Sequence, residues 1–165
     1  MHKHLNFICP TDNLETVIQQ TFLQENYFYT SLGNSITLDS ETTEQINAII
    51  ELNSITDITI FLSLDNQIIQ SALHNRKLSK IKGMGSFYGT IDSQLRQLSF
   101  NQKINDIELH LITSYLNKKT NELYQHLIKE FGNKTTINAL IYNRESKVFV
   151  EAESKLFQLE RCSLN

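Results

Sequence analysis

Short apolar runs alternate with amphipathic segments along the first half of the chain. Three runs have strand character: "HLNFIC" at 4–9, "YFYTSL" at 27–32 and "DITIFLSL" at 57–64. The third is apolar on both faces, as a strand buried inside a parallel sheet is. Helical spacing of apolar residues follows the first two runs, from a capping box at Asp12 and Glu15 and from an N-cap at Ser40. The pattern predicts a β-α-β-α-β series.

The third run leads into a short predicted helix with apolar residues at helical spacing: Ile68, Ile69, Ala72 and Leu73. Its natural N-cap is Asp65 or Asn66, since either side chain can accept a hydrogen bond from the exposed amides. A purely structural role as a helix cap is therefore the first interpretation of these two polar residues.

The second half of the chain has a weaker pattern at first. Residues 74–103 form an excursion in which only 90–98, "TIDSQLRQL", has helical spacing. Residues 106–131 predict one long helix, although "IELHLI" within them alternates like a strand, so a strand followed by a helix is the alternative. "INALIYN" and "KVFVEA", at 137–143 and 147–152, then predict a hairpin whose last strand is antiparallel. The fold class is α/β with a mostly parallel five-stranded sheet.

Composition supports one folded domain over residues 1–165, since 40% of the residues are hydrophobic and 20% are charged. The net charge of −3 favours neither nucleic acid nor an anionic membrane as a partner. Cys9 and Cys162 are the two cysteines, too few for a disulfide scaffold. No apolar stretch approaches the ~18 residues of a membrane span, and no signal-peptide pattern opens the chain. We therefore expect a cytoplasmic protein.

The order of elements and four short motifs resemble the β-class carbonic anhydrases over residues 5–152. The family's Cys-x-Asp-x-Arg falls on "CPTDN" at 9–13, and its Asn-Ala-Gly-Asn falls on "SLGN" at 31–34. Its Gly-His-x-Asp-Cys-Gly falls on "LSLDNQ" at 62–67, and its Tyr-Asp-x-x-Thr-Gly-x-Leu hairpin falls on "YNRESKVF" at 142–149. The resemblance implies the strand order 2-1-3-4-5 and a homodimer.

The departures from the family pattern fall on the zinc site. The resemblance implies a zinc held by two cysteines and a histidine, and here these positions are Cys9, Ser63 and Asn66. Hydroxyl and carboxamide groups do not replace imidazole and thiolate as zinc ligands. The Asp/Arg pair of the family is replaced by Thr11 and Asn13. We therefore predict no metal and a vestigial pocket, made of Cys9, Thr11, Asp12, Gly33, Asn34, Ser63, Asp65 and Asn66.

Other candidate chemistry is weaker. His4 is ~16 Å from Cys9 along one strand, too far to share an ion, and His110 and His126 are expected to face solvent. Cys9 could be a reactive thiol at a helix N-terminus, but a buried small hydrophobic residue is the favoured interpretation. A basic loop could bind an anion such as phosphate through Arg76, Lys77, Lys80 and Lys82, with a solvated flap as the favoured interpretation.

These observations predict a catalytically inactive, zinc-less carbonic-anhydrase-like domain that binds an unknown protein partner or dimerises through its outer surface. One alternative is a rearranged zinc carbonic anhydrase in which Cys9 and His74 or Cys162 hold the metal. The other is a module for a small anion or phosphate ligand that uses the basic loop.

Overall fold

The computed structural model of the chain describes residues 2–74, 81, 83–97, 104–131 and 135–152. A five-stranded sheet has the order β2-β1-β3-β4-β5. Its strands are β1 (Lys3–Ile8), β2 (Glu25–Thr30), β3 (Asp57–Ser63), β4 (Thr136–Asn143) and β5 (Val148–Glu151). The first four are parallel and β5 is antiparallel to β4, which confirms the predicted fold class, strand order and hairpin.

The helices are α1 (Glu15–Thr21), α2 (Ser40–Asn53), α3 (Gln67–Leu73), α4 (Met84–Gln97) and α5 (Ile104–Phe131), with 3-10 turns η1 (Pro10–Asp12) and η2 (Leu32–Asn34). The long helix is confirmed over its strand-plus-helix alternative. Its residues in the larger core lie at helical spacing: Ile112, the neighbours Tyr115 and Leu116, Leu123 and Leu127. That stripe packs against the sheet, so helical spacing prevails over the local alternation.

Three details of the helices differ from the prediction. The capping box at Asp12 is wrong, because Leu14 is the N-cap residue of α1, and the Asp12 side chain is engaged elsewhere. The cap of α2 is Asp39 rather than Ser40, and its carboxylate accepts a hydrogen bond from the Thr42 amide at 2.9 Å. Helix α4 starts at Met84, well before the predicted residue 90, because Met84 and Phe87 are buried and hold its first turns on the core.

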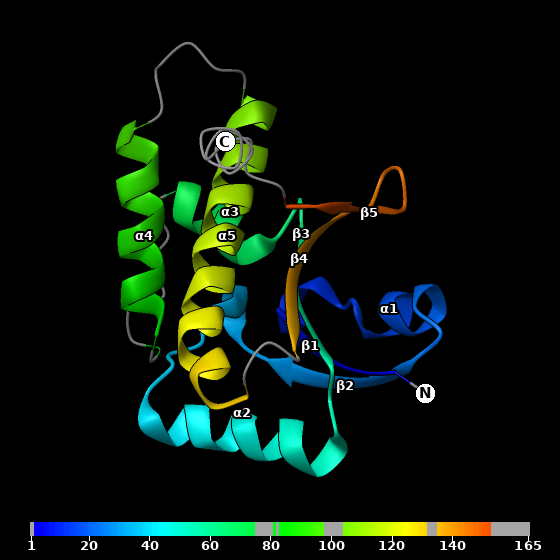
Figure 1. The fold of residues 1–165 in the computed structure, drawn as a ribbon. Helices are drawn as coiled ribbons and strands as arrows, with labels where there is room; N and C mark the ends of the chain where they lie inside the picture. The colour runs from blue at the N-terminus through cyan, green and yellow to red at the C-terminus, as the bar shows by residue number, and fades with distance from the viewer. Residues whose placement is uncertain (1, 75–80, 82, 98–103, 132–134, 153–165) are drawn as a thin grey trace, which may run out of the picture.

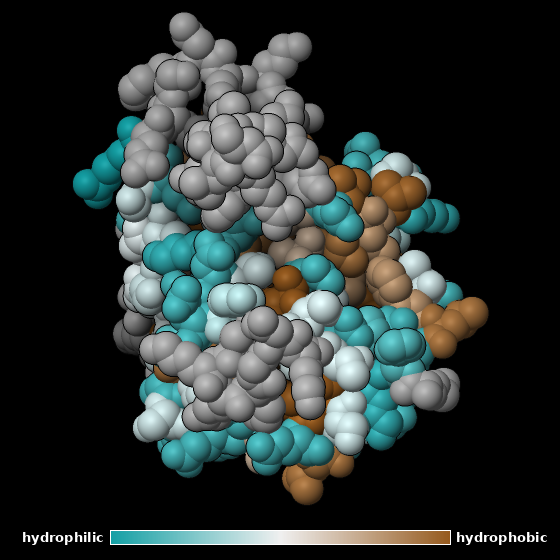
Figure 2. Space-filling model, viewed as in Figure 1, coloured by the Kyte–Doolittle hydropathy of each residue, from teal (hydrophilic) through white to brown (hydrophobic). Residues whose placement is uncertain are grey.

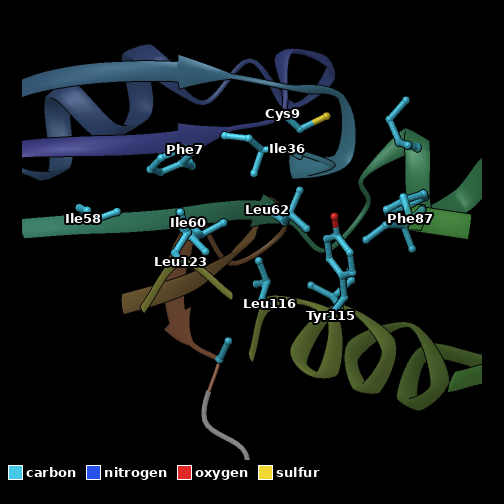
Figure 3. Packing of buried hydrophobic residues seen from close by; sticks show 14 of the residues in the cluster. Phe7, Cys9, Ile36, Ile58, Ile60, Leu62, Phe87, Tyr115, Leu116 and Leu123 are labelled. Atoms are coloured by element: carbon cyan, nitrogen blue, oxygen red, sulfur yellow. The ribbon is translucent and has the colours of Figure 1, made fainter. Parts of the chain in front are cut away.

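Helices α3, α4 and α5 lie on one side of the sheet and α1 lies on the other (Figure 1). Strand β3 has buried side chains on both faces, since Ile58, Ile60 and Leu62 belong to the larger core and Phe61 belongs to the cluster under α1. Figure 3 shows the larger core between β3 and the α5 residues Tyr115, Leu116 and Leu123. Full burial of such a side chain contributes roughly 1.5–3 kcal/mol, so β3 is the structural centre of the domain.

Within the part of the chain that the structure describes, no helix combines the length and the apolarity needed to span a membrane.

Candidate functional site

Polar side chains gather where the parallel strands β1, β3 and β4 end. Cys9 follows β1, Ser63 is the last residue of β3 and Arg144 follows β4. Parallel strands place their carboxyl ends at one edge of the sheet, and this edge is where open α/β sheets bind ligands. Helix α3 also starts here and packs against both η1 and η2.

Asp12 is the centre of this polar cluster. Its side chain is 1% exposed, and its two carboxylate oxygens accept hydrogen bonds from the Ser63 backbone amide and the Asn66 side-chain amide, each at 2.8 Å. Burial raises the pKa of Asp12, although both hydrogen bonds and the nearby Arg144 act in the opposite direction. Asp12 therefore joins the ends of β1 and β3 and the start of α3.

Asn66 uses both ends of its carboxamide. The Nδ2 group donates to Asp12, while Oδ1 accepts hydrogen bonds from the amides of Ile68 and Ile69, each at 3.0 Å. The N-cap of α3 is therefore Asn66, the second of the two residues for which capping was predicted. Asn66 is fully buried, so these bonds are made out of contact with water.

Ser63 and Asp65 form a second pair beside the first. The Ser63 hydroxyl donates a hydrogen bond to Asp65 Oδ1, and the same oxygen accepts one from Arg144 Nε at 3.0 Å. Burial alone would raise the pKa of Asp65, but these two donors outweigh it and lower that pKa. The side chain of Asp65 is 61% exposed, so it lies at the rim of the cluster.

Cys9 lies in a separate part of the same edge. It is fully buried, and its Sγ accepts a hydrogen bond from the Gly33 amide at 3.1 Å and lies 3.1 Å from Thr11 Oγ1. Gly33 has a φ of +58°, a conformation that favours glycine, and an added Cβ would lie 3.1 Å from Ile68. The thiol is thus enclosed as a buried small side chain is, in line with the favoured interpretation.

Asn34 connects the thiol region with the long helix. Its Nδ2 donates to the carbonyl of Phe61 at 2.7 Å, and its own carbonyl accepts a hydrogen bond from the Tyr115 hydroxyl at 3.0 Å. Tyr115 is fully buried, and burial, with Glu122 and Cys9 nearby, raises its pKa well above the ordinary value. Figure 3 shows the Tyr115 hydroxyl and Cys9 on the same side of the core.

Arg144 and Tyr115 were not among the predicted site residues. Besides its bond to Asp65, the Arg144 guanidinium donates to the backbone carbonyl of Asp12. The available signal for Arg144 was its place in a turn directly after a strand parallel to β3. Tyr115 had no such signal, since it is one apolar-face position among many on a long helix.

A surface hollow of about 260 Å³ lies beside this cluster. It is lined by Leu64, Asp65, Glu108, Asn143, Arg144 and Glu145. Three of these side chains are acidic and one is basic, so the hollow does not match an anionic ligand.

The remaining predicted residues lie away from this cluster or outside the described structure. His74 is exposed at the end of α3, and its Nδ1 is 2.8 Å from the Gln70 carbonyl. His74 and Asn66 flank the seven residues of α3, so the rise of the helix places them about 12 Å apart. His110 and His126 are exposed on α5, as predicted. Cys162 and the four basic residues Arg76, Lys77, Lys80 and Lys82 lie outside the described residues.

His4 lies at the opposite end of β1 from Cys9, and its Nε2 is 3.4 Å from Asp57. Burial lowers the pKa of His4, although Asp57 favours the charged ring. Among the residues with described positions, no three side chains drawn from His, Cys, Asp and Glu come close enough to share a metal ion.

Comparison with known proteins identifies the architecture. No family model matches the sequence, and no curated protein is significantly similar to it. Solved structures do match: the β-carbonic anhydrase CafD of Aspergillus fumigatus has a TM-score of 0.76 and 16% identity over 92% of this chain and 89% of that chain.

Two further structures agree. CafA, a second β-carbonic anhydrase of Aspergillus fumigatus, has a TM-score of 0.74 and 15% identity over 97% of this chain and 80% of that one. A tetrameric β-carbonic anhydrase of Sordaria macrospora has a TM-score of 0.70 and 12% identity over 91% and 80% of the two chains. With the strand order and the polar cluster at the sheet edge, these matches establish that the chain has the fold of the β-carbonic anhydrases.

Proposed function

We propose that this protein is a zinc-less carbonic-anhydrase-like domain without hydration activity, which acts as a binding or regulatory scaffold through its outer surface. One observation carries the proposal. Asn66 stands where the family resemblance implies a cysteine ligand, and both ends of its carboxamide are already hydrogen-bonded. The Nδ2 group donates to Asp12, and Oδ1 caps α3.

Binding zinc at this position would require Asn66 to release bonds that hold the fold. Loss of the cap costs about 1 kcal/mol, and a buried Asp12 carboxylate without its donor costs about 1–3 kcal/mol more. The return is small, since a carboxamide oxygen is a poor zinc ligand. Ser63 is similarly engaged with Asp65. Cys9 is the one thiol in the cluster, and one ligand does not make a zinc site.

The chemistry of hydration needs a strong nucleophile at neutral pH. Zinc supplies it by lowering the pKa of bound water from 15.7 to about 7. The carboxylates present, Asp12 and Asp65, are already engaged with hydrogen-bond donors. General-base assistance is worth roughly 10²–10⁴-fold, which does not replace a bound hydroxide.

Zinc content tests the proposal. We expect far less than one zinc per chain by elemental analysis of protein purified without an affinity tag, and carbon dioxide hydration at the uncatalysed rate. The double variant Ser63→His with Asn66→Cys is the positive control, because it restores the implied ligand set beside Cys9 and should raise the zinc content. A wild-type protein with close to one zinc per chain would refute the proposal and favour the rearranged site with His74 or Cys162.

The anion-binding alternative has its own test. Calorimetric titration with inorganic phosphate should give no binding heat. Saturable binding that is lost in Lys77→Ala with Lys80→Ala would favour the phosphate module over the scaffold.

A further inference from the structure

Part of the sheet face that α5 covers is still exposed at β5. Val150 is the cross-strand partner of Ile141, and Ala152 follows it two residues later. Ile141 and Ala152 both belong to the larger core, so side chains at this register point to the α5 side of the sheet. Val148 and Val150 point the same way, yet their exposed fractions are 47% and 52%. The described helices therefore leave these two valines uncovered, and Figure 2 shows hydrophobic side chains gathered over the region of β5.

Helix α5 continues this exposed surface. Leu109 lies seven residues before the core residue Leu116, which places it on the sheet-facing side of the helix, but it is 45% exposed. Its neighbour Glu108 lines the same surface hollow as Asn143, and Asn143 is the cross-strand partner of Val148. Leu109 therefore lies near the valines of β5. The exposed apolar face consists of Leu109, Val148 and Val150.

Apolar surface on the last strand of a sheet needs protection from contact with other chains. Natural edge strands are protected by lysine, by proline, by a bulge, or by a helix or loop that covers them. The stretch "VFV" at 148–150 has no lysine and no proline, and its pairing with β4 continues without a bulge. Coverage by another segment is therefore the protection that this strand still requires.

The segment that follows β5 in the sequence has the composition to cover this face. Residues 153–165, "ESKLFQLERCSLN", lie outside the described structure, and they include Leu156, Phe157 and Leu159 within four positions. The segment starts directly after Ala152, whose side chain is buried in the larger core. Figure 1 shows β5 ending beside α5. Residues 153–165 therefore begin on the same side of the sheet as the exposed apolar face.

The lengths of chain involved permit this coverage. Val148 is four residues before Ala152, which is about 13 Å along the strand. Phe157 is five residues after Ala152, and five residues span up to about 16 Å. Because the segment is joined covalently to β5, its effective concentration at the face is on the order of millimolar. Burial of one or two apolar side chains, at roughly 1.5–3 kcal/mol each, is then enough to favour the covered state.

We propose that residues 153–165 bind back over the exposed apolar face of the same chain. The segment is then a built-in competitor, because an apolar segment of another protein can bind this face only after displacing it. This inference goes beyond the proposed scaffold function and does not depend on the zinc content, because no residue of the polar cluster takes part. The two proposals are therefore tested by separate measurements.

Thiol labelling of the full chain tests the coverage. Cys9 is fully buried, so Val150→Cys in a Cys162→Ser background supplies one accessible thiol, located on the exposed apolar face. Phe157→Ser with Leu159→Ser then removes the apolar contacts of the segment. We expect these two serines to raise the rate of maleimide labelling at position 150 about tenfold, which corresponds to a loss of about 1.4 kcal/mol of contact energy. Circular dichroism verifies that each variant is folded.

The matched control is Leu52→Cys in the same background, at a residue of α2 that is 84% exposed and away from β5 (Figure 1). Its labelling rate should be the same with and without the two serines. Equal rates at position 150 with and without the serines would overturn the proposal. A similar rise at position 52 would also overturn it, because it would indicate a general loosening of the chain. Protection of position 150 that increases with protein concentration would do so as well, because it would assign the face to a second copy.

Discussion

At the residue scale, Asn66 is one of the two residues, with Ser63, that stand where the family resemblance implies zinc ligands. A cysteine at position 66 could not cap α3 and satisfy Asp12 together, because a thiol is a weak donor and a weak acceptor. Asn66 has a donor and an acceptor on opposite ends of one planar group, and it uses both. The same residue thus stabilises the fold in a place where the family resemblance implies a ligand.

Substitution of Asn66 measures this structural role. Asn66→Ala removes the cap and leaves the buried Asp12 without one of its donors, so we expect a loss of about 2–4 kcal/mol in the free energy of unfolding. Asp65→Ala is the matched control and should cost under about 1 kcal/mol, because Asp65 is at the rim and its ion pair with Arg144 is exposed. Urea denaturation of both variants gives the comparison. Equal losses would show that Asn66 contributes no more to stability than the rim residue Asp65.

At the element scale, the start of α4 depends on a close approach between two loops. Gly83 precedes α4 with a φ of +85°, and an added Cβ would lie 2.4 Å from the carbonyl oxygen of Ser35. That contact joins the segment after η2 to the first turn of α4. Glycine is required here both by its conformation and by the space.

Two glycines of this region should therefore respond in opposite directions to alanine. Gly83→Ala should destabilise the protein by about 1–3 kcal/mol, through a strained backbone and a clash with a main-chain atom. Gly85→Ala should stabilise it by about 0.5–1 kcal/mol, because Gly85 is inside α4 and nothing lies within 4 Å of an added Cβ. Thermal melts distinguish the two, since 1 kcal/mol corresponds to about 2–4 °C in a domain of this size. The same sign for both variants would contradict this account of Gly83.

At the scale of the whole molecule, one sheet joins all the described helices. The larger core includes residues from β1 to Ala152, the residue after β5, and the smaller cluster under α1 shares β3 with it. A domain built in this way should unfold as one cooperative unit.

Calorimetry tests the single domain. We expect one transition whose calorimetric and van't Hoff enthalpies agree, because the two apolar clusters share β3 and should unfold together. Two resolved transitions would contradict the single domain of residues 1–165.

Much of the architecture was available from local pattern. Three local patterns were enough to predict the α/β class. Strand β3 is apolar on both faces, α5 has apolar residues at helical spacing, and a polar stretch separates the two strands of the final hairpin. The start of α4 could not, because glycines at 85 and 89 weaken the local signal, and burial of Met84 and Phe87 against distant residues overrides it. The prediction that Asp12 caps α1 was wrong for a related reason. The Asp12 carboxylate accepts a hydrogen bond from the Ser63 amide, which is far away in the sequence.

The features of the candidate site also divide into those that the sequence determines and those that depend on the tertiary structure. Ser63 and Asn66 are poor zinc ligands because of their side-chain chemistry, which the sequence alone gives. Only the packing of the strand ends brings Asn66 to Asp12, 54 positions away. The same packing places Arg144 within hydrogen-bond distance of both Asp12 and Asp65. The chemistry of each side chain is therefore determined by the sequence alone. Hydrogen-bond partners far apart in sequence depend on the sheet that brings them within 3 Å, because these bonds act only at contact distance.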